Sequence, residues 1–334
     1  MKKAAIIGCG GISQVHAWVL KNMEDVTVTA LCDIKPEKAQ ELAHEQLEDS
    51  NVFICEDYRE LFDRDVDVVH ICTPHYLHAP MAVEFLKHGK AVFMEKPCAI
   101  STEQFEELKK ADETYPGKLG ICFQNRYNES FRTMEKLITD DEIGTVIGGR
   151  AFVTWKRDND YYEISDWKGR IDKEGGGVLI NQSIHTLDLL LMFLGEPEMV
   201  KAGIANHHSD VEVEDTVEAW MSFGGGKRAC FYASNGYVTD APVFLEIQGT
   251  KGCLTMNGVS LSLQPKNGRP KTCSLEASGN IGKSYWGNGH KACIKDFYHC
   301  LEEGIPYRNN LASVENVFKV IMEIYGQTRK KIFK

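Results

Sequence analysis

Two short segments of the chain combine side chains in a pattern suited to moving a proton. Glu95-Lys96-Pro97 follows a short apolar run, and Asn181 and His185 stand four residues apart, just after three consecutive glycines. Burial or a nearby cation makes a lysine amine easier to deprotonate than in water, which suits proton transfer, and an imidazole exchanges protons near neutral pH. We predict Lys96, His185 and Asn181 as catalytic residues. A solvated loop lysine and a core histidine are the structural alternatives.

A glycine-rich turn near the start of the chain predicts a dinucleotide site. Gly8-Cys9-Gly10-Gly11-Ile12 lies between a strand-like run and a helical pattern, where backbone can approach a pyrophosphate facing the helix N-terminus. Asp33 ends the second strand-like run roughly 20 residues further on, where a carboxylate accepts hydrogen bonds from ribose hydroxyls and repels a 2′-phosphate. Ser13 stands where the full fingerprint has Gly or Ala. The turn therefore predicts NAD rather than NADP, bound by Gly8, Gly10, Gly11, Ile12 and Asp33.

Three more segments are expected at the carboxyl ends of parallel strands, where ligands bind in such sheets. They are residues 72–78, 95–97 and 124–126. The further cofactor-binding residues that they predict are Thr73, Pro74, His78, Glu95, Lys96 and Asn125.

The first 122 residues alternate strand-like and helical patterns. The predicted strands are apolar throughout, as in a parallel sheet buried on both faces. They span residues 4–7, 26–32, 66–72, 91–94 and 119–123, with helices over 12–20, 36–47, 77–87 and 101–114. We predict an α/β fold that begins with a Rossmann domain at residues 1–122, a doubly wound parallel sheet.

After residue 123 strands follow one another without helices between them. Strands are expected over residues 145–155, 199–207, 216–223, 228–234, 243–249 and 252–256, and helices over 129–138, 178–194, 291–301 and 314–325. Strands in series favour a large, mostly antiparallel sheet. Residues 123–334 are predicted to form an α+β domain for substrate binding and oligomerisation. In one continuous helix over 178–194, Asn181 and His185 would share a face.

Composition excludes several classes of partner. The formal net charge is −10 and no long basic run occurs, which argues against nucleic acid or an anionic membrane as a partner. No apolar stretch approaches the roughly 20 residues of a membrane span. The eleven cysteines form no Cys-x-x-Cys motif and several lie in apolar runs, as in a reducing compartment, so the cytoplasm is expected. No metal site is predicted, since neither Cys72, His75 and His78 nor His207-His208 makes a convincing ligand set.

Several motifs in order resemble one enzyme family. Glu95-Lys96-Pro97, the early glycine turn and the Gly-Gly-Gly segment with Asn181, His185 and Asp188 are similar to the glucose–fructose oxidoreductase/inositol dehydrogenase/rhizopine catabolism (Gfo/Idh/MocA) family. The resemblance extends over nearly the whole chain. It implies a Rossmann domain, an open sheet that often forms a dimer or tetramer interface, and NAD(P)-linked oxidation or reduction of a sugar or cyclitol carbon.

The resemblance also implies roles for individual residues. Lys96 matches the lysine that hydrogen-bonds the reacting hydroxyl, and His185 matches the histidine that acts as acid/base or substrate contact. Asn181 stands where inositol dehydrogenase-like members have aspartate, which puts a Lys–His–Asp relay in doubt. Residues predicted to bind the substrate are Lys96, Arg126, Tyr162, Trp167, Asn181 and His185, with His75 and His290 as weaker candidates.

Three functions are compatible with these motifs. The first is an NAD-dependent oxidoreductase that transfers hydride between a sugar, polyol or cyclitol carbon and nicotinamide. The second is a glycosidase of the same fold that oxidises its substrate only transiently, and the third is a non-catalytic sugar or NAD sensor, which Lys96 and His185 disfavour. A small-molecule substrate and a homodimer or homotetramer are expected. The apolar strand residues considered for the subunit interface are Val217, Ala219, Met221, Phe231 and Phe244.

Overall fold

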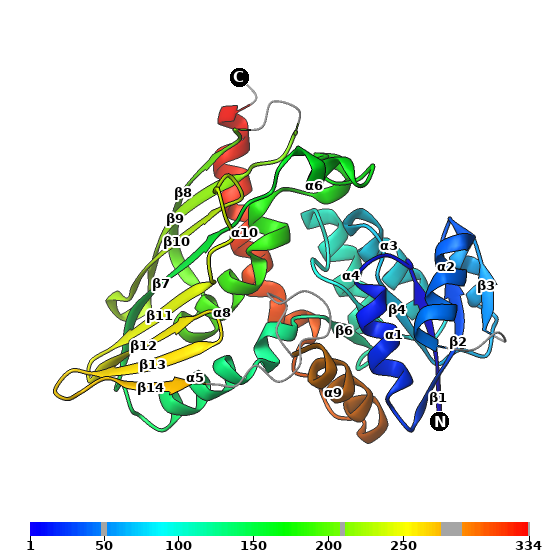
Figure 1. The fold of residues 1–334 in the computed structure, drawn as a ribbon, viewed down its shortest axis with the longest axis horizontal. Helices are drawn as coiled ribbons and strands as arrows, with labels where there is room; N and C mark the ends of the chain where they lie inside the picture. The colour runs from blue at the N-terminus through cyan, green and yellow to red at the C-terminus, as the bar shows by residue number, and fades with distance from the viewer. Residues whose placement is uncertain (48–51, 208–210, 275–288, 333–334) are drawn as a thin grey trace. The chain divides into compact units, whose positions relative to one another are not determined.

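The computed structural model describes residues 1–47, 52–207, 211–274 and 289–332. The chain divides into two compact units (Figure 1). The first comprises Met1–Gln124 and a later stretch that includes α9 (Gly289–Glu303) and ends at Ser313. The second begins at Asn125 and includes most of α10 (Leu311–Ile332). The predicted boundary at 122/123 is close to the first division, but the return of α9 to the first unit was not predicted.

The first unit is built on a six-stranded parallel sheet in the order β3-β2-β1-β4-β5-β6, the strand order of dinucleotide-binding Rossmann domains. Every residue of β4 and β5 is buried, as the unbroken apolar runs predict. The strands are β1 (Lys2–Ile7), β2 (Val26–Cys32), β3 (Phe53–Cys55), β4 (Val68–Ile71), β5 (Ala91–Met94) and β6 (Leu119–Ile121).

The helices between these strands begin where their sequence signals predict. Pro36 occupies the first turn of α2, and the Ser101 hydroxyl accepts a hydrogen bond from the Gln104 amide to cap α4. The helices are α1 (Ser13–Lys21), α2 (Pro36–Leu42), the π-helical turn η1 (Ala43–Leu47), the 3-10 turn η2 (Tyr58–Leu61), α3 (His75–Lys87) and α4 (Thr102–Thr114). Strand β3 was not predicted.

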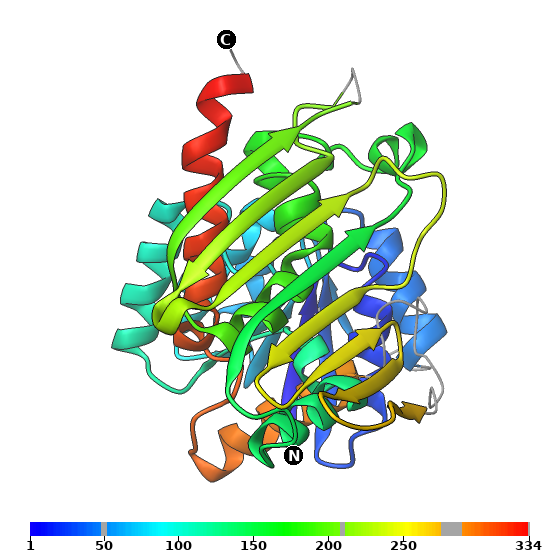
Figure 2. The same ribbon diagram turned by 90° about the vertical axis from the view of Figure 1, so that its left-hand side faces the viewer.

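The second unit contains an eight-stranded sheet in the order β14-β13-β12-β11-β7-β10-β9-β8 (Figure 2). Neighbouring strands are antiparallel except β7 and β10, which run parallel, so the mostly antiparallel prediction is confirmed. The strands are β7 (Val146–Thr154), β8 (Pro197–Ala205), β9 (Thr216–Phe223), β10 (Arg228–Ser234), β11 (Phe244–Gly249), β12 (Gly252–Asn257), β13 (Ser260–Pro265) and β14 (Lys271–Ser274). Helix α8 (Ile184–Leu194) packs against β7 and β11, and α5 (Glu129–Thr139) packs against β12 and β13. Short turns complete the unit: η3 (Gln124–Tyr127), α6 (Asn159–Glu163), α7 (Ile171–Glu174), η4 (Val178–Gln182) and η5 (Gly224–Gly226).

The prediction of one continuous helix over residues 178–194 is wrong. The π-helical turn η4 ends at Gln182, α8 begins at Ile184, and the segment Ile171–Gln182 is bent by 58° from α8. The Ser183 amide and hydroxyl both donate to the carbonyl of Val178, at 2.8 and 2.7 Å, which closes the turn five residues back. Asn181 and His185 therefore do not share one helix face.

Among the described residues no single helix is both long and apolar enough to cross a membrane. Only the bent pair Ile171–Gln182 and Ile184–Leu194 meets the length and composition criteria when its two parts are taken together.

Most of the apolar strand residues considered for the subunit interface do not lie on an open face of the eight-stranded sheet. Val217, Ala219, Met221 and Phe231 are buried, so they belong to the core rather than to an open face. The alternate positions of the same strands carry the exposed side chains, and Trp220 is 66% exposed. Other apolar or aromatic side chains that stay at least partly exposed are Ile147, Phe152, Met199, Tyr232 and Phe244.

A buried ion pair fixes helix α8 inside the second unit. The guanidinium of Arg126 donates from Nε and Nη2 to the two carboxylate oxygens of Asp188, at 2.8 and 2.5 Å. Both side chains are almost completely buried. Removing one partner of such a pair leaves the other charge without compensation in the interior.

We expect Asp188→Asn to lower the free energy of unfolding by about 3–5 kcal/mol, since it leaves the Arg126 charge buried without its carboxylate. Asp140 is a matched control because it pairs with Lys136 on the exposed surface of α5. Asp140→Asn should cost less than about 1 kcal/mol. Urea denaturation followed by tryptophan fluorescence measures both, and equal costs would show that the buried pair has no special weight.

Candidate active site

The glycine turn of the first unit leaves room for a ligand. Gly8 has φ +85°, and a Cβ there would lie 2.7 Å from the Cys72 carbonyl oxygen, so only glycine fits. A Cβ on Gly10 or Gly11 would meet no atom within 4 Å, so backbone amides there border open space. Ser13, in place of the fingerprint glycine, is buried and donates to the Gly10 carbonyl at 2.5 Å. The serine therefore stabilises the turn that opens α1 next to Ile12.

Asp33 stands where the ribose of a dinucleotide would need a carboxylate. Its two oxygens accept the amides of Cys9 and Lys35 at 2.7 and 2.9 Å, which fix the side chain against the glycine turn. Carboxylate oxygens hold further acceptor sites after one hydrogen bond each, and these can take ribose hydroxyls. The turn and Asp33 together fit an NAD cofactor.

The segment after β4 lies at the start of α3, with Pro74 as its N-cap residue. His78 follows one turn later and is buried, with Nδ1 2.8 Å from the Pro97 carbonyl oxygen and Nε2 2.8 Å from the Thr73 carbonyl oxygen. Burial lowers its pKa despite these carbonyls. A neutral imidazole has one N–H and so donates to one of these two carbonyls, and the contact of His78 with the cofactor stays a prediction.

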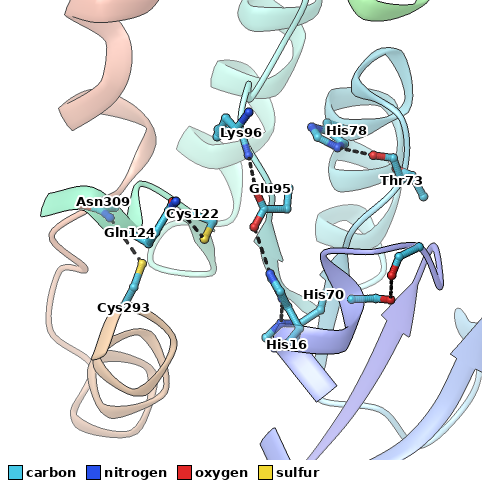
Figure 3. A network of polar contacts seen from close by, with 12 residues as sticks. His16, His70, Thr73, His78, Glu95, Lys96, Cys122, Gln124, Cys293 and Asn309 are labelled. Atoms are coloured by element: carbon cyan, nitrogen blue, oxygen red, sulfur yellow. Dashed lines mark hydrogen bonds and ion pairs between the residues drawn. The ribbon is translucent and has the colours of Figure 1, made fainter. Parts of the chain in front are cut away.

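Glu95 at the end of β5 closes a chain of buried hydrogen bonds (Figure 3). Its Oε1 lies 3.0 Å from His16 Nε2, His16 Nδ1 lies 2.9 Å from His70 Nδ1, and His70 Nε2 lies 3.0 Å from the Tyr298 hydroxyl. The other Glu95 oxygen accepts the Lys96 amide at 3.3 Å. The network joins α1, β4, β5 and α9 of the first unit directly below the segment that carries Lys96.

The ionised form of Glu95 determines the direction of these hydrogen bonds. Burial raises the pKa of Glu95, but the hydrogen bond from His16 outweighs it and lowers the pKa below its ordinary value. Burial also lowers the pKa of His70, which keeps its ring neutral. A carboxylate only accepts, so His16 donates from Nε2 to Glu95, and the neutral His70 ring donates from one of its nitrogens and accepts at the other. Each buried polar atom then has a partner of the right kind.

Metal-ligating side chains also meet in this network. The ligand atoms of His16, Glu95 and Cys122 all lie within 4.8 Å of one another. His16 and Glu95 already satisfy each other by a hydrogen bond, and burial raises the pKa of Cys122, which favours the thiol over the metal-binding thiolate. His290 on α9 is buried as well, and burial lowers its pKa to about 4.

The second unit holds Asn181 and His185, both buried. The Asn181 amide nitrogen lies 2.6 Å from Glu174 Oε1 and 3.4 Å from the Tyr161 hydroxyl, which also accepts from Gln182 Nε2 at 3.0 Å. The Gly169 amide donates to the other Glu174 oxygen at 2.5 Å. Asn181, predicted as a catalytic residue, is therefore coupled to a buried carboxylate that the sequence did not single out.

Glu214 explains why glycine stands before η4. Its carboxylate accepts the amides of Gly177 and Leu179 at 3.0 and 3.1 Å and the Tyr325 hydroxyl at 2.8 Å. A Cβ on Gly177 would lie 1.9 Å from the Glu214 carbonyl oxygen. The close approach that the glycines permit here is thus made by the protein's own backbone.

The other predicted substrate residues, and Asn125, which was predicted to bind the cofactor, fall in two environments of the second unit. Arg126 is buried in its pair with Asp188, and Asn125 precedes it in η3. Tyr162 is buried beside Tyr161 on α6, and Trp167 is partly exposed next to Lys168, whose ammonium lies 3.9 Å from the centre of the Tyr161 ring. Contacts of these residues with a substrate stay predictions, as does the contact predicted for His75, which is buried at the start of α3 in the first unit.

Sequence reasoning missed Glu174, Glu214 and the His16–His70–Tyr298 chain. Glu174 had one local signal, because it directly precedes the three glycines. The partners of the other residues are far apart in sequence: Glu95 comes 79 residues after His16, and Tyr298 comes 228 residues after His70. No periodicity could have predicted these pairs.

Comparisons with known proteins identify the family. Residues 2–121 match the domain described as "Oxidoreductase family, NAD-binding Rossmann fold", and residues 131–255 match the "GFO/IDH/MocA C-terminal domain". The chain belongs to the Gfo/Idh/MocA family. It is therefore an NAD-binding oxidoreductase, and the resemblance predicted from the motifs is confirmed.

Relatives within the Gfo/Idh/MocA family act on sugars and cyclitols. Inositol 2-dehydrogenase from Rhizobium meliloti is 28% identical over 258 residues, which cover 75% of this chain and 73% of that protein. The WlbA dehydrogenase from Bordetella pertussis, solved with NADH and UDP-GlcNAcA, has a TM-score of 0.87 at 21% identity and covers 99% of this chain and 96% of its own. Levoglucosan dehydrogenase, solved with NADH and levoglucosan, has a TM-score of 0.84 at 21% identity, with 98% and 97% covered. At these identities the solved structures establish the shared fold.

The buried carboxylate of Glu174 predicts a pH-dependent stability. Burial raises its pKa to about 7 from the ordinary 4.5, so between these values the folded chain holds a proton that the unfolded chain has lost. Stability should therefore fall as the pH rises through this range, by about 3 kcal/mol in total. Urea denaturation at pH 5.5 and pH 8 should show about 2 kcal/mol of this loss in the natural chain and a smaller loss in Glu174→Gln. Glu212→Gln, an exposed neighbour that accepts the Ile171 amide, should keep the full loss. Identical pH dependence in all three proteins would refute the raised pKa.

Proposed function

We propose that this protein is an NAD-dependent dehydrogenase that oxidises a secondary hydroxyl of a sugar, polyol or cyclitol. The observation that supports this most is Lys96 in the Glu95-Lys96-Pro97 segment, in the same unit as the glycine turn and Asp33. The relatives' activities agree with a polyhydroxylated substrate of this kind.

The residues of the first unit suit the binding of NAD and the handling of a proton. Gly8, Gly10, Gly11 and Ile12 would face the pyrophosphate, and Asp33 the adenosine ribose, where its negative charge disfavours a 2′-phosphate. When bound, NAD accepts or gives a hydride at its nicotinamide ring. Lys96 would hydrogen-bond the reacting hydroxyl, with the ionised Glu95 below it held by His16.

Loss of hydride from a carbinol carbon requires loss of the hydroxyl proton, so a positioned base is needed at that oxygen. We assign this task to Lys96 together with His185, with Asn181 as a contact to the substrate. Arg126 serves in this proposal mainly to hold α8, and Tyr162 and Trp167 border the substrate.

Turnover should distinguish catalytic from structural roles. Lys96→Met and His185→Ala should each lower kcat by roughly 10²–10⁴-fold, because general acid–base help is worth about that much. NAD binding and melting temperature should stay near those of the natural chain. The assay is NADH formation with a panel of myo-inositol, levoglucosan and UDP-GlcNAcA.

Surface residues of the same types give the controls for this test. Lys87→Met and His299→Ala change an exposed lysine and an exposed histidine of the first unit and should leave kcat unchanged. Near-natural turnover in Lys96→Met would show that the role assigned to this lysine is wrong. Product formation without net NADH would instead favour the glycosidase that oxidises its substrate transiently.

We also propose that the protein is a homo-oligomer assembled through the outer face of the eight-stranded sheet, and that it works in the cytoplasm. Figure 2 turns this face toward the viewer, with α8 behind the sheet. Trp220 and Met199 are exposed on it, and apolar surface of this kind is commonly covered by a second subunit. The free cysteines of the described residues, most of them buried, fit a reducing compartment.

Trp220→Glu should shift the protein toward the monomer, because a carboxylate at the centre of an apolar interface cannot be solvated there. Light scattering at micromolar concentration measures the mass of both proteins. Tyr115→Glu, a half-exposed aromatic residue of the first unit, is the control and should keep the mass of the natural chain. A monomer in the natural protein would contradict the proposal.

A further inference from the structure

Asn181 is an unusual residue to place in a proton-transfer site, because an amide neither gains nor loses a proton at ordinary pH. The structure couples it to a group that can. Glu174 is fully buried at the end of α7 and lies 2.6 Å from the Asn181 amide nitrogen. The residue pair belongs to one unit and to one continuous segment, Ile171–Gln182.

The hydrogen bonds around this pair orient the Asn181 amide. Its nitrogen has two hydrogens, and the acceptors facing it are Glu174 Oε1 and the Tyr161 hydroxyl. The second Glu174 oxygen is held by the Gly169 amide at 2.5 Å. The amide nitrogen therefore faces Glu174, and the carbonyl oxygen of Asn181 points to the other side.

We propose that Glu174 is a positioning residue of the active site, which acts through Asn181 and supplies the carboxylate that position 181 itself lacks. This inference rests on the proposed function, in which Asn181 contacts the substrate. The proton on Glu174 controls which atom Asn181 presents.

Donor and acceptor rules explain how the proton on Glu174 determines which atom Asn181 presents. Ionised Glu174 only accepts, so it holds the Asn181 nitrogen and leaves the Asn181 oxygen as an acceptor on the other side. In this proposal the proton on Glu174 lies on Oε1 and points at Asn181, while Oε2 keeps accepting from the Gly169 amide. A donor then faces a donor, and the Asn181 amide must turn over to present its nitrogen instead. One proton thus converts the outward atom of Asn181 from an acceptor to a donor.

The surroundings of Glu174 place this change near neutral pH. Burial raises the pKa of Glu174 to about 7, while the hydrogen bonds from Gly169 and Asn181 oppose the rise. The nearby charge of Glu214 raises it further and that of Lys168 lowers it. The titratable and charged groups that face Glu174 from the neighbouring segments are Tyr161, Tyr162, Lys168 and Glu214.

Two variants test the proposal through the pH profile of kcat. The probe is myo-inositol or, if the enzyme does not turn over myo-inositol, the panel member that it does turn over. The kcat of the natural enzyme should show an inflection near pH 7. Glu174→Gln should lose this inflection and at least tenfold in kcat above pH 7. The double variant Glu174→Gln/Asn181→Asp moves the carboxylate to position 181 and keeps one hydrogen bond between the pair, so it should recover most of the lost turnover.

The matched control is Glu212→Gln, which also removes a carboxylate bound to a backbone amide of α7, at its first residue, Ile171. It should keep both rate and profile. A folded Glu174→Gln enzyme with the natural rate and inflection would overturn the proposal, and so would a double variant that recovers nothing.

A measurement without substrate separates this inference from the proposed function. Infrared difference spectra of the full chain, recorded between pH 5 and pH 9, should contain the carbonyl band of a protonated buried carboxyl that disappears with a midpoint near 7. The band should be missing in Glu174→Gln and present in Lys96→Met. If the band persists in Glu174→Gln, the inference fails whatever the enzyme does; if it behaves as expected while Lys96→Met keeps its turnover, the proposed function fails instead.

Discussion

Asp188 and Arg126 hold each other inside the second unit through two hydrogen bonds, and the helix that carries His185 is anchored by this pair. A carboxylate that leaves water must find partners in the interior, because its desolvation costs several kcal/mol. Asp188 finds a permanent cation. Its position one turn after His185 therefore keeps α8 in place.

Three other buried carboxylates meet the same requirement in different ways. Glu95 accepts a hydrogen bond from the imidazole of His16 and stays ionised, with its pKa lowered. Glu214 takes two backbone amides and a tyrosine hydroxyl and so defines the turn that opens η4. Glu174 accepts from a backbone amide and from the Asn181 amide, and burial still raises its pKa. Burial raises the pKa of Glu214 as well, so the hydrogen bond from His16 is what distinguishes Glu95, whose pKa is lowered, from these two carboxylates.

These differences between buried carboxylates show how single positions can change the properties of a fold that the Gfo/Idh/MocA family shares. The Rossmann unit supplies the glycine turn and Asp33, which we propose as the cofactor site. The second unit supplies α8 and the turn before it, bent by 58° where Ser183 closes back on Val178. Because the bend separates Asn181 from the face of α8, the partner of Asn181 is Glu174 on α7 rather than a residue one helical turn away.

The sequence by itself determined the parts that depend on local pattern. Unbroken apolar strands, the glycine turn with Asp33, the Ser101 cap and the Glu95-Lys96-Pro97 segment predicted the parallel sheet and its cofactor, because periodicity and turn chemistry act over a few residues. The tertiary structure decided the rest: the break at Ser183, the inward face of Val217 and Phe231, and the partners of Glu95, Asp188 and Glu174. A pattern predicts which residues are buried, but burial alone does not say which hydrogen bond a buried polar group makes. That choice depends on side chains brought together from distant positions, and it determines the chemistry each group can perform.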